Sequence, residues 1–212
     1  IDYLQKQLQP PRLTWDSWTT VPIGHFAFNW QILVIMMLSL AVDDIHLAGV
    51  VLRFFGLWPS AQALLAAGEA VFLASLTVAL NISFKNEKAV HLFRATECLF
   101  IQWTAKNIKW LQSSQLNNSD CIDFVPNCFD AIMALKGVGR KVAIMVMKIC
   151  FNQDVGVAVD RHVYRMAIQF GWACPAMTDD QVSIYIDRFF HPQDFQYVNL
   201  AWAGCGQVLH RQ

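Results

Sequence analysis

Two long stretches of this 212-residue chain, residues 26–42 and residues 70–84, contain no charged side chain. Segments that are mostly aliphatic and aromatic must be buried, either in a protein core or in a lipid bilayer. A membrane-spanning helix needs about 20 mostly apolar residues. Both runs are shorter, the first includes Asn29, Gln31 and Ser39, and no basic cluster marks a cytoplasmic side. The runs therefore favour buried helices of a soluble protein, without a membrane partner.

Apolar residues recur with the helical period along most of the chain, and no run alternates convincingly with the period of a strand. Asp43-Asp44 and Pro59-Ser60 are typical of helix starts. No internal repeat of solenoid length is evident. With 55% hydrophobic and 15% charged residues, the chain can build a large core. The predicted fold class is all-α, with helices near residues 31–41, 45–55, 61–67, 69–80, 87–103 and 127–135.

The chain has six cysteines, and no two of them form a C-x-x-C motif for zinc or redox chemistry. Several lie in apolar surroundings, where a reduced cysteine behaves as a small hydrophobic residue. We therefore expect core thiols in a reducing compartment and no metal site. The six are Cys98, Cys121, Cys128, Cys150, Cys174 and Cys205.

The sequence ALKGVGRKVAIMVMKICF, residues 134–151, predicts a turn between two helices. Gly137 and Gly139 allow backbone angles that other residues avoid, so the turn can be tight and its amides can converge. Amides at a helix start, helped by the helix dipole, form an anion site that does not read sequence, and a phosphodiester suits such a site. A G-x-G between helices is by itself more often an ordinary connection. The neighbouring motifs favour the anion site.

Residues 135–143 resemble the motif L-P-G-V-G-R-K-T-A of the endonuclease III family of helix-hairpin-helix DNA glycosylases. Asp160 follows Lys141 by nineteen residues and lies in a second match, to the family motif V-D-x-H-x-x-R. Further similarities, such as NEKA, extend the resemblance over about residues 26–206. The matching residues of the two motifs are Leu135, Gly137, Val138, Gly139, Arg140, Lys141 and Ala143, then Val159, Asp160, His162 and Arg165.

The resemblance implies a two-domain, all-α fold. Residues 27–153 would form a helical barrel that carries the hairpin. Residues 1–26 and 154–212 would pack together as the second domain, with the active site in the cleft between the two domains. The chain would then be a monomeric enzyme of DNA base-excision repair, located in the nucleus or another compartment that contains DNA.

The implied substrate is double-stranded DNA with a damaged base, an oxidised pyrimidine in the family's default case, or with an abasic site. Such enzymes flip the damaged nucleotide out of the duplex before they remove its base. By resemblance, Lys141 is the nucleophile that forms a Schiff base and permits β-elimination, and Asp160 is its electrostatic partner. The apolar residues after Lys141 predict burial, which would lower the pKa of the lysine.

Other residues are implicated in DNA binding by their places in the family pattern. Lys136, Gly137, Val138, Gly139 and Arg140 form the expected phosphate-binding hairpin, with Lys136 in place of the family's proline. Phe84 lies where the family inserts an apolar side chain into the duplex. At the position of the glutamine that fills the gap left by the flipped base, this chain has Ala41.

The family's four-cysteine iron–sulfur loop has no counterpart here. The C-terminal sequence AWAGCGQVLHRQ resembles the segment just before that loop, and His210 lies near the expected first cysteine. Only Cys205 is present in this region, whereas four thiolates normally hold such a cluster. We expect no iron–sulfur cluster and no other cofactor.

Alternatives to these roles remain open. Asp160 is also a suitable helix N-cap, and Lys141 with Lys148 could form one solvated stripe. His162 suits a structural hydrogen bond, and Arg165 is given no catalytic role. At the level of function, the chain could be a glycosylase without lyase activity, for example one specialised for mismatches, or a silent DNA-binding module.

The formal net charge is zero, which is unusual for a DNA-binding protein. Residues 130–170, however, contain six basic and three acidic side chains, a local net charge of +3. Residues 84–109 also carry a net charge of +3. A local basic face would be sufficient to bind DNA.

Overall fold

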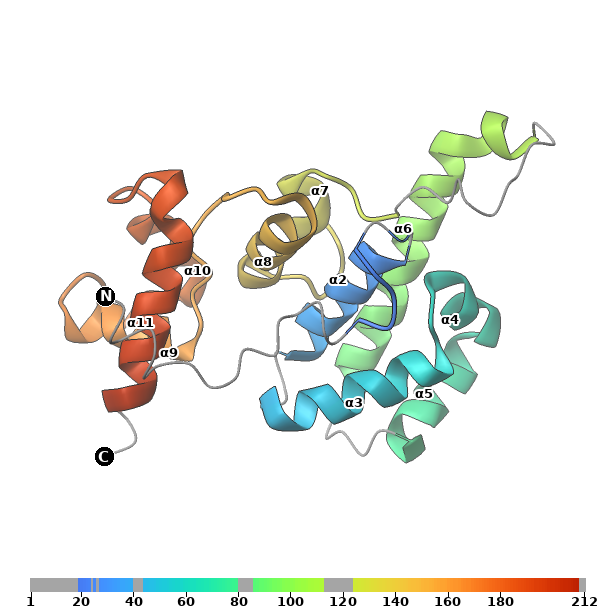
Figure 1. The fold of residues 1–212 in the computed structure, drawn as a ribbon, viewed down its shortest axis with the longest axis horizontal. Coiled ribbons are helices and arrows are strands. Elements are labelled where there is room, and N and C mark those ends of the chain that lie inside the picture. Colours follow the sequence, from blue (N-terminus) through green and yellow to red (C-terminus); the bar gives the residue numbers. More distant parts are fainter. Residues whose placement is uncertain are drawn as a thin grey trace. The chain divides into compact units, whose positions relative to one another are not determined.

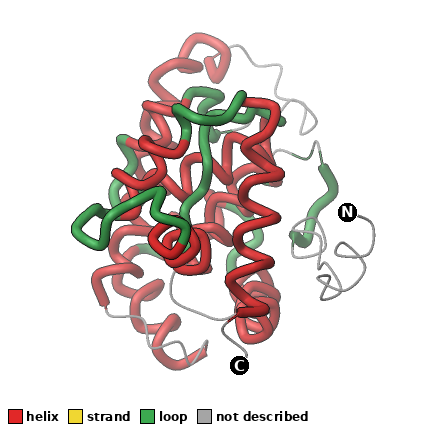
Figure 2. Tube along the Cα trace, turned by 90° about the vertical axis from the view of Figure 1, so that its left-hand side faces the viewer, coloured by secondary structure: helices red, strands yellow, loops and turns green. Residues whose placement is uncertain are grey.

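The computed structural model describes residues 19–23, 25, 27–39, 44–79, 86–112 and 124–209. Over these ranges the backbone is helix or loop and contains no strand (Figure 1, Figure 2). The all-α prediction is therefore confirmed. Ala41, Phe84, Cys121 and His210 lie outside the described residues, so their predicted roles stay predictions.

One compact unit lies within Leu13–Val138. Its most buried element is α2, in which every side chain from Phe28 to Leu38 is buried. The rings of Phe54, Trp58 and Phe72 pack edge to face in the same unit. The uncharged run around α2 is thus a core helix, as predicted. The helices of this unit are α2 (Phe28–Ser39), α3 (Asp44–Leu57), α4 (Ala61–Ala67), α5 (Glu69–Ala79), α6 (Asn86–Gln112) and α7 (Phe129–Met133).

None of the described helices is by itself long and apolar enough to cross a membrane. Leu47–Leu57 and Ala61–Ala67 together have the required length and composition, but a bend of 71° separates them.

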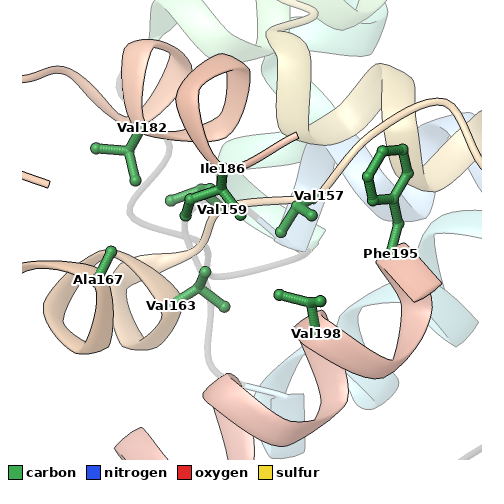
Figure 3. Packing of buried hydrophobic residues seen from close by; sticks show 8 residues of the cluster. All are labelled: Val157, Val159, Val163, Ala167, Val182, Ile186, Phe195 and Val198. Atoms are coloured by element: carbon green, nitrogen blue, oxygen red, sulfur yellow. The ribbon is translucent and has the colours of Figure 1, made fainter. Parts of the chain in front are cut away.

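The second unit contains Gly139–Gln212. Its helices are α8 (Arg140–Phe151), α9 (Arg161–Gln169), α10 (Asp179–Ile186), the short 3-10 helix η2 (Pro192–Asp194) and α11 (Phe195–Leu209). Apolar side chains from the segment before α9, from α10 and from α11 meet in one core (Figure 3). Val157, Val182 and Ile186 are completely buried there. The predicted domains, residues 27–153 against residues 1–26 with 154–212, stay a prediction.

Gln31 is the one fully buried polar side chain of α2 and is 0% exposed. Its Oε1 accepts a hydrogen bond from the Thr20 N–H at 2.9 Å. Its Nε2 donates to Thr20 Oγ1 and to the Pro59 carbonyl, both at 2.9 Å. A buried amide with these three partners ties α2 to the chain before it and to the start of α4.

We expect Gln31→Met to lower the free energy of unfolding by about 1–3 kcal/mol, because it leaves polar groups of Thr20 and Pro59 without a partner. Urea unfolding measures this change. The control is Gln102→Met on the exposed face of α6, which should change the free energy by less than about 0.5 kcal/mol. Equal effects of the two variants would contradict a structural role for the Gln31 amide.

Candidate functional site

The chain turns between α7 and α8 through residues 134–139. Ala134 follows α7, and the Val138 N–H donates to the Leu135 carbonyl at 3.1 Å. Leu135 and Val138 are 3% and 8% exposed, whereas Lys136 between them is exposed. Two buried apolar side chains therefore anchor this turn, and its polar residue faces solvent.

Gly137 is required for two independent reasons. Its φ is +82°, a value in the left-handed region that favours glycine. A Cβ atom at this position would also lie 2.5 Å from the Cβ of His91, which belongs to α6 in the same unit. Both backbone conformation and close packing therefore exclude a side chain at residue 137.

Gly139 is different, because its φ of −98° suits any residue. A Cβ built there would meet nothing within 4 Å, so the space beside its Cα is open. Gly139 is the N-cap of α8, and no side chain caps this helix. The first turn of α8 has no acidic residue. The positive end of the helix dipole at this point favours an anion.

Arg140 begins α8, and its guanidinium is bound within the protein. Nε donates to Ser183 Oγ at 2.8 Å, and Nη2 donates to Asp187 Oδ2 at 2.5 Å. The side chains of Arg140 and Asp187 are only 16% and 17% exposed. Both of these partners belong to α10 or to its C-cap. The predicted contact of Arg140 with DNA stays a prediction.

Lys141 is half-buried in the first turn of α8. In the part of the chain that the structure describes, no carboxylate or hydrogen-bond acceptor pairs with its amine. Lys148, seven residues later, instead donates to Asp154 Oδ2 at 2.8 Å. Buried apolar side chains, Val142 to Ile144 with Val146 and Met147, cover the core face of α8. The two lysines therefore do not form one uniform solvated stripe.

Asp160 is the N-cap of α9. Its Oδ1 accepts a hydrogen bond from the Val163 N–H at 2.8 Å. Its Oδ2 has no hydrogen-bond partner among the described residues, and the side chain is half-buried. The capping role is observed, and it leaves one carboxylate oxygen for another contact. Lys141 and Asp160 belong to the same unit, although no hydrogen bond or ion pair joins them within the described ranges.

His162 and Arg165 are the two remaining residues of the second motif. His162 packs against Gly206 of α11, where a Cβ would lie 2.9 Å from the histidine Cβ. The Nδ1 atom of His162 is buried and has no hydrogen-bond partner among the described residues, so the expected structural hydrogen bond is absent at this atom. Arg165 is exposed.

The described residues provide no ligand set for a metal or an iron–sulfur cluster. No three His, Cys, Asp or Glu side chains within them lie close enough together to hold an ion. Cys98, Cys128, Cys174 and Cys205 are free thiols. Cys128, Cys174 and Cys205 are exposed, so the prediction of core thiols is wrong for these three. The predicted absence of a cofactor stays a prediction.

Comparison with known proteins identifies relatives in sequence and in fold. No protein-family model matches the chain. Endonuclease III of Rickettsia conorii is 28% identical to it over 162 residues, which are 75% of this chain and 67% of the relative. The endonuclease III homologue of Schizosaccharomyces pombe is 29% identical over 85 residues, 40% of this chain and 24% of the relative. That match therefore spans about a quarter of the relative's length.

Two solved structures have the same fold. Endonuclease III trapped as a covalent intermediate with DNA has a TM-score of 0.66 at 19% identity, over 96% of this chain and 80% of that one. A thermostable thymine-DNA glycosylase has a TM-score of 0.67 at 15% identity, over 97% of this chain and 83% of that one.

The fold is thus the all-α fold of the helix-hairpin-helix DNA glycosylases. In sequence the chain is similar to endonuclease III, and the predicted resemblance to that family is confirmed.

Sequence reasoning missed three residues around the hairpin: His91, Ser183 and Asp187. Ser183 and Asp187 lie 43 and 47 residues after Arg140. Nothing in their local pattern marks them, because an acidic residue after an amphipathic helix is ordinary. His91 follows the NEKA motif by two residues, and that position gave no reason to expect contact with a glycine.

We expect Gly137→Ala to lower the free energy of unfolding by about 1–2 kcal/mol through its positive φ alone, and by more because of the collision with His91. Gly139→Ala, which meets neither obstacle, should change stability by less than about 0.5 kcal/mol. Urea unfolding of both variants measures the contrast. Adding His91→Ala to Gly137→Ala should recover only the part due to the collision. A full recovery would show that the backbone conformation is unimportant.

Proposed function

We propose that this protein is a base-excision DNA glycosylase that removes a damaged base, an oxidised pyrimidine in the first instance, and then cleaves the abasic site through a Schiff base. The observation that carries the proposal is the position of Lys141. It is a half-buried lysine without an ionic partner among the described residues, in the first turn of a helix whose N-cap is an unobstructed glycine.

DNA phosphates suit the start of α8. The open space beside Gly139 allows a phosphodiester to approach the backbone, and the helix dipole favours its charge. Lys136, exposed in the preceding turn, adds a cation near a bound strand. Endonuclease III itself has been solved in a complex with DNA, which supports double-stranded DNA as the partner of this chain and a compartment that contains DNA as its location. The monomeric state stays a prediction.

The chemistry needs a neutral amine and a fixed negative charge. The Lys141 Nζ attacks the anomeric carbon of the flipped nucleotide, and the bond between that carbon and the base breaks. The base leaves with the electron pair of that bond and takes up a proton. Loss of the amine proton and opening of the sugar ring give the imine, from which β-elimination releases the 3′ phosphate. Lys141 therefore serves in both base removal and strand cleavage.

Asp160 stabilises the positive charge that develops on the sugar while the bond to the base breaks. Its Oδ1 is held by the Val163 N–H, so the carboxylate has a fixed orientation. Oδ2 is the oxygen that remains for this role. The N-cap contact thus fixes the position of the carboxylate and does not compete with catalysis.

We expect Lys141→Gln to bind abasic duplex DNA but to give no covalent adduct when borohydride is added, because an amide cannot form an imine. The measurement is a denaturing gel of the trapped complex together with the β-elimination product. The matched control is Lys148→Gln on the same helix, whose lysine is ion-paired with Asp154. This control should trap DNA as the wild type does.

Trapping by a folded Lys141→Gln protein would remove Lys141 from the mechanism. Excision without trapping by the wild type would favour the alternative glycosylase without lyase activity. DNA binding with neither reaction would favour the silent binding module. A panel of duplexes, each with one damaged base, identifies the lesion, and failure on oxidised pyrimidines alone would change only the substrate.

We expect Asp160→Asn to slow base excision by about a hundredfold or more, the effect of losing one transition-state electrostatic contact. Asparagine is as good an N-cap as aspartate, so the melting temperature should stay close to that of the wild type. Single-turnover excision and thermal unfolding give the two values. Asp160→Ala, which loses the cap as well, should be less stable by about 1 kcal/mol. A normal excision rate for Asp160→Asn would limit Asp160 to its capping role.

A further inference from the structure

We infer that Asp187, acting through Arg140 and Val157, is a positioning residue that fixes Lys141 and Asp160 relative to each other. The inference rests on the proposed function and deepens it. Asp187 itself touches no reacting group. It connects the start of α8, which carries Lys141, to the segment that leads into Asp160.

Each carboxylate oxygen of Asp187 holds one of these two parts of the unit. Oδ2 accepts a hydrogen bond from Nη2 of Arg140 at 2.5 Å, and Arg140 immediately precedes Lys141 in the sequence. Oδ1 accepts from the Val157 N–H at 2.8 Å, three residues before Asp160. A carboxylate that bridges two segments in this way restrains both of them against the end of α10.

Ser183 makes a second bridge, parallel to the first. Its hydroxyl accepts from Arg140 Nε at 2.8 Å and donates to the Val157 carbonyl at 2.7 Å. One hydroxyl can do both, since it has one donor and two acceptor sites. Both backbone polar groups of Val157 are therefore bound by α10 or its C-cap, and both groups are linked to the same guanidinium.

Packing makes this arrangement stiff. A Cβ on Gly156 would lie 2.9 Å from Asp187 Oδ2, 3.0 Å from Arg140 Nη2 and 3.1 Å from Ile144 Cδ1. The backbone at residue 156 therefore lies directly against the ion pair and against α8. The ion pair of Arg140 and Asp187 is also largely shielded from water. Ionic hydrogen bonds are stronger in such a shielded position than at an exposed surface.

The local position of Asp187 does not benefit α10. Asp187 is the C-cap of this helix, and a negative charge at a helix C-terminus is unfavourable. The hydrogen bonds that Asp187 accepts from Arg140 and from the Val157 N–H offset this unfavourable interaction with the helix dipole. The stabilising contacts of this carboxylate are thus with the two segments that carry Lys141 and Asp160, which is the arrangement expected of a positioning residue.

The test compares Asp187→Asn with Asp154→Asn. Asparagine at residue 187 keeps an acceptor for the Val157 N–H but removes the charge that holds Arg140. Asp154→Asn removes the ionic partner of Lys148 at the other end of α8, a pair of similar exposure at 28% and 21%. The measurements are the single-turnover rate of excision and borohydride trapping at saturating DNA, and the DNA concentration that gives half of that rate.

We expect Asp187→Asn to lower the saturated rate by on the order of 10- to 100-fold, the effect of misplacing reacting groups by about 1 Å. The half-saturating DNA concentration of Asp187→Asn should change by less than about threefold. Asp154→Asn should keep the wild-type rate, because the ion pair of Asp154 with Lys148 is not part of the link between Lys141 and Asp160. If Asp187→Asn does not fold, Ser183→Ala interrupts the parallel bridge and should lower the saturated rate in the same way.

Equal saturated rates for Asp187→Asn and Asp154→Asn would overturn the inference. A change confined to the half-saturating concentration would also overturn it, because Arg140 would then act in DNA binding. A wild-type protein that neither excises nor traps would instead remove the proposed function, and the inference with it, before any variant is compared.

Discussion

A buried stretch of irregular backbone constrains the unit that carries both candidate reactive residues. Residues 156–159 are buried but not helical, so their backbone polar groups cannot be satisfied by an α-helix of their own. The Val157 N–H instead donates to the Asp187 carboxylate, and the Val157 carbonyl accepts from the Ser183 hydroxyl. That carboxylate in turn needs a cation, which Arg140 provides. The routes of α8, of α10 and of the chain into α9 therefore depend on one connected set of hydrogen bonds.

The starts of α8, α9 and α10 show how the chain satisfies the first amides of a helix. Thr178 and Gln181 form a reciprocal capping box on α10, and Asp160 caps α9 with one oxygen. Gly139 precedes α8 without a side-chain cap. Glycine at an N-cap is less favourable than serine or threonine by only a few tenths of a kcal/mol. The chain can therefore leave the start of α8 accessible with little loss of stability, which is compatible with a backbone site for phosphate.

Local features of the fold could be predicted from the sequence, and contacts distant in the chain could not. The helical period, the glycine turn at Gly137 and the cap at Asp160 depend on neighbouring residues, and each is observed. The burial of Gln31 is different, because its partners lie 11 and 28 residues away and its position in an apolar run gave no sign of them. The contacts of Arg140 with Ser183 and Asp187 are similar, because these partners lie more than forty residues later in the chain and its own motif gave no sign of them. Tertiary packing, which a linear pattern does not encode, decided both cases.

The same long-range pairing changes what the local charges mean. The net charge of +3 for residues 130–170 counts Arg140 but not Asp187, which lies outside that window and neutralises it. Arg94, within residues 84–109, likewise binds Glu69 from outside its window as well as Glu97. Under the proposed function, the positive charge available to a DNA strand is thus smaller than either window suggests. Because counterion release scales with the number of phosphates that cations neutralise, the proposed DNA binding would depend more on backbone amides and a few cations such as Lys136. A shallow dependence of affinity on salt follows directly from that balance.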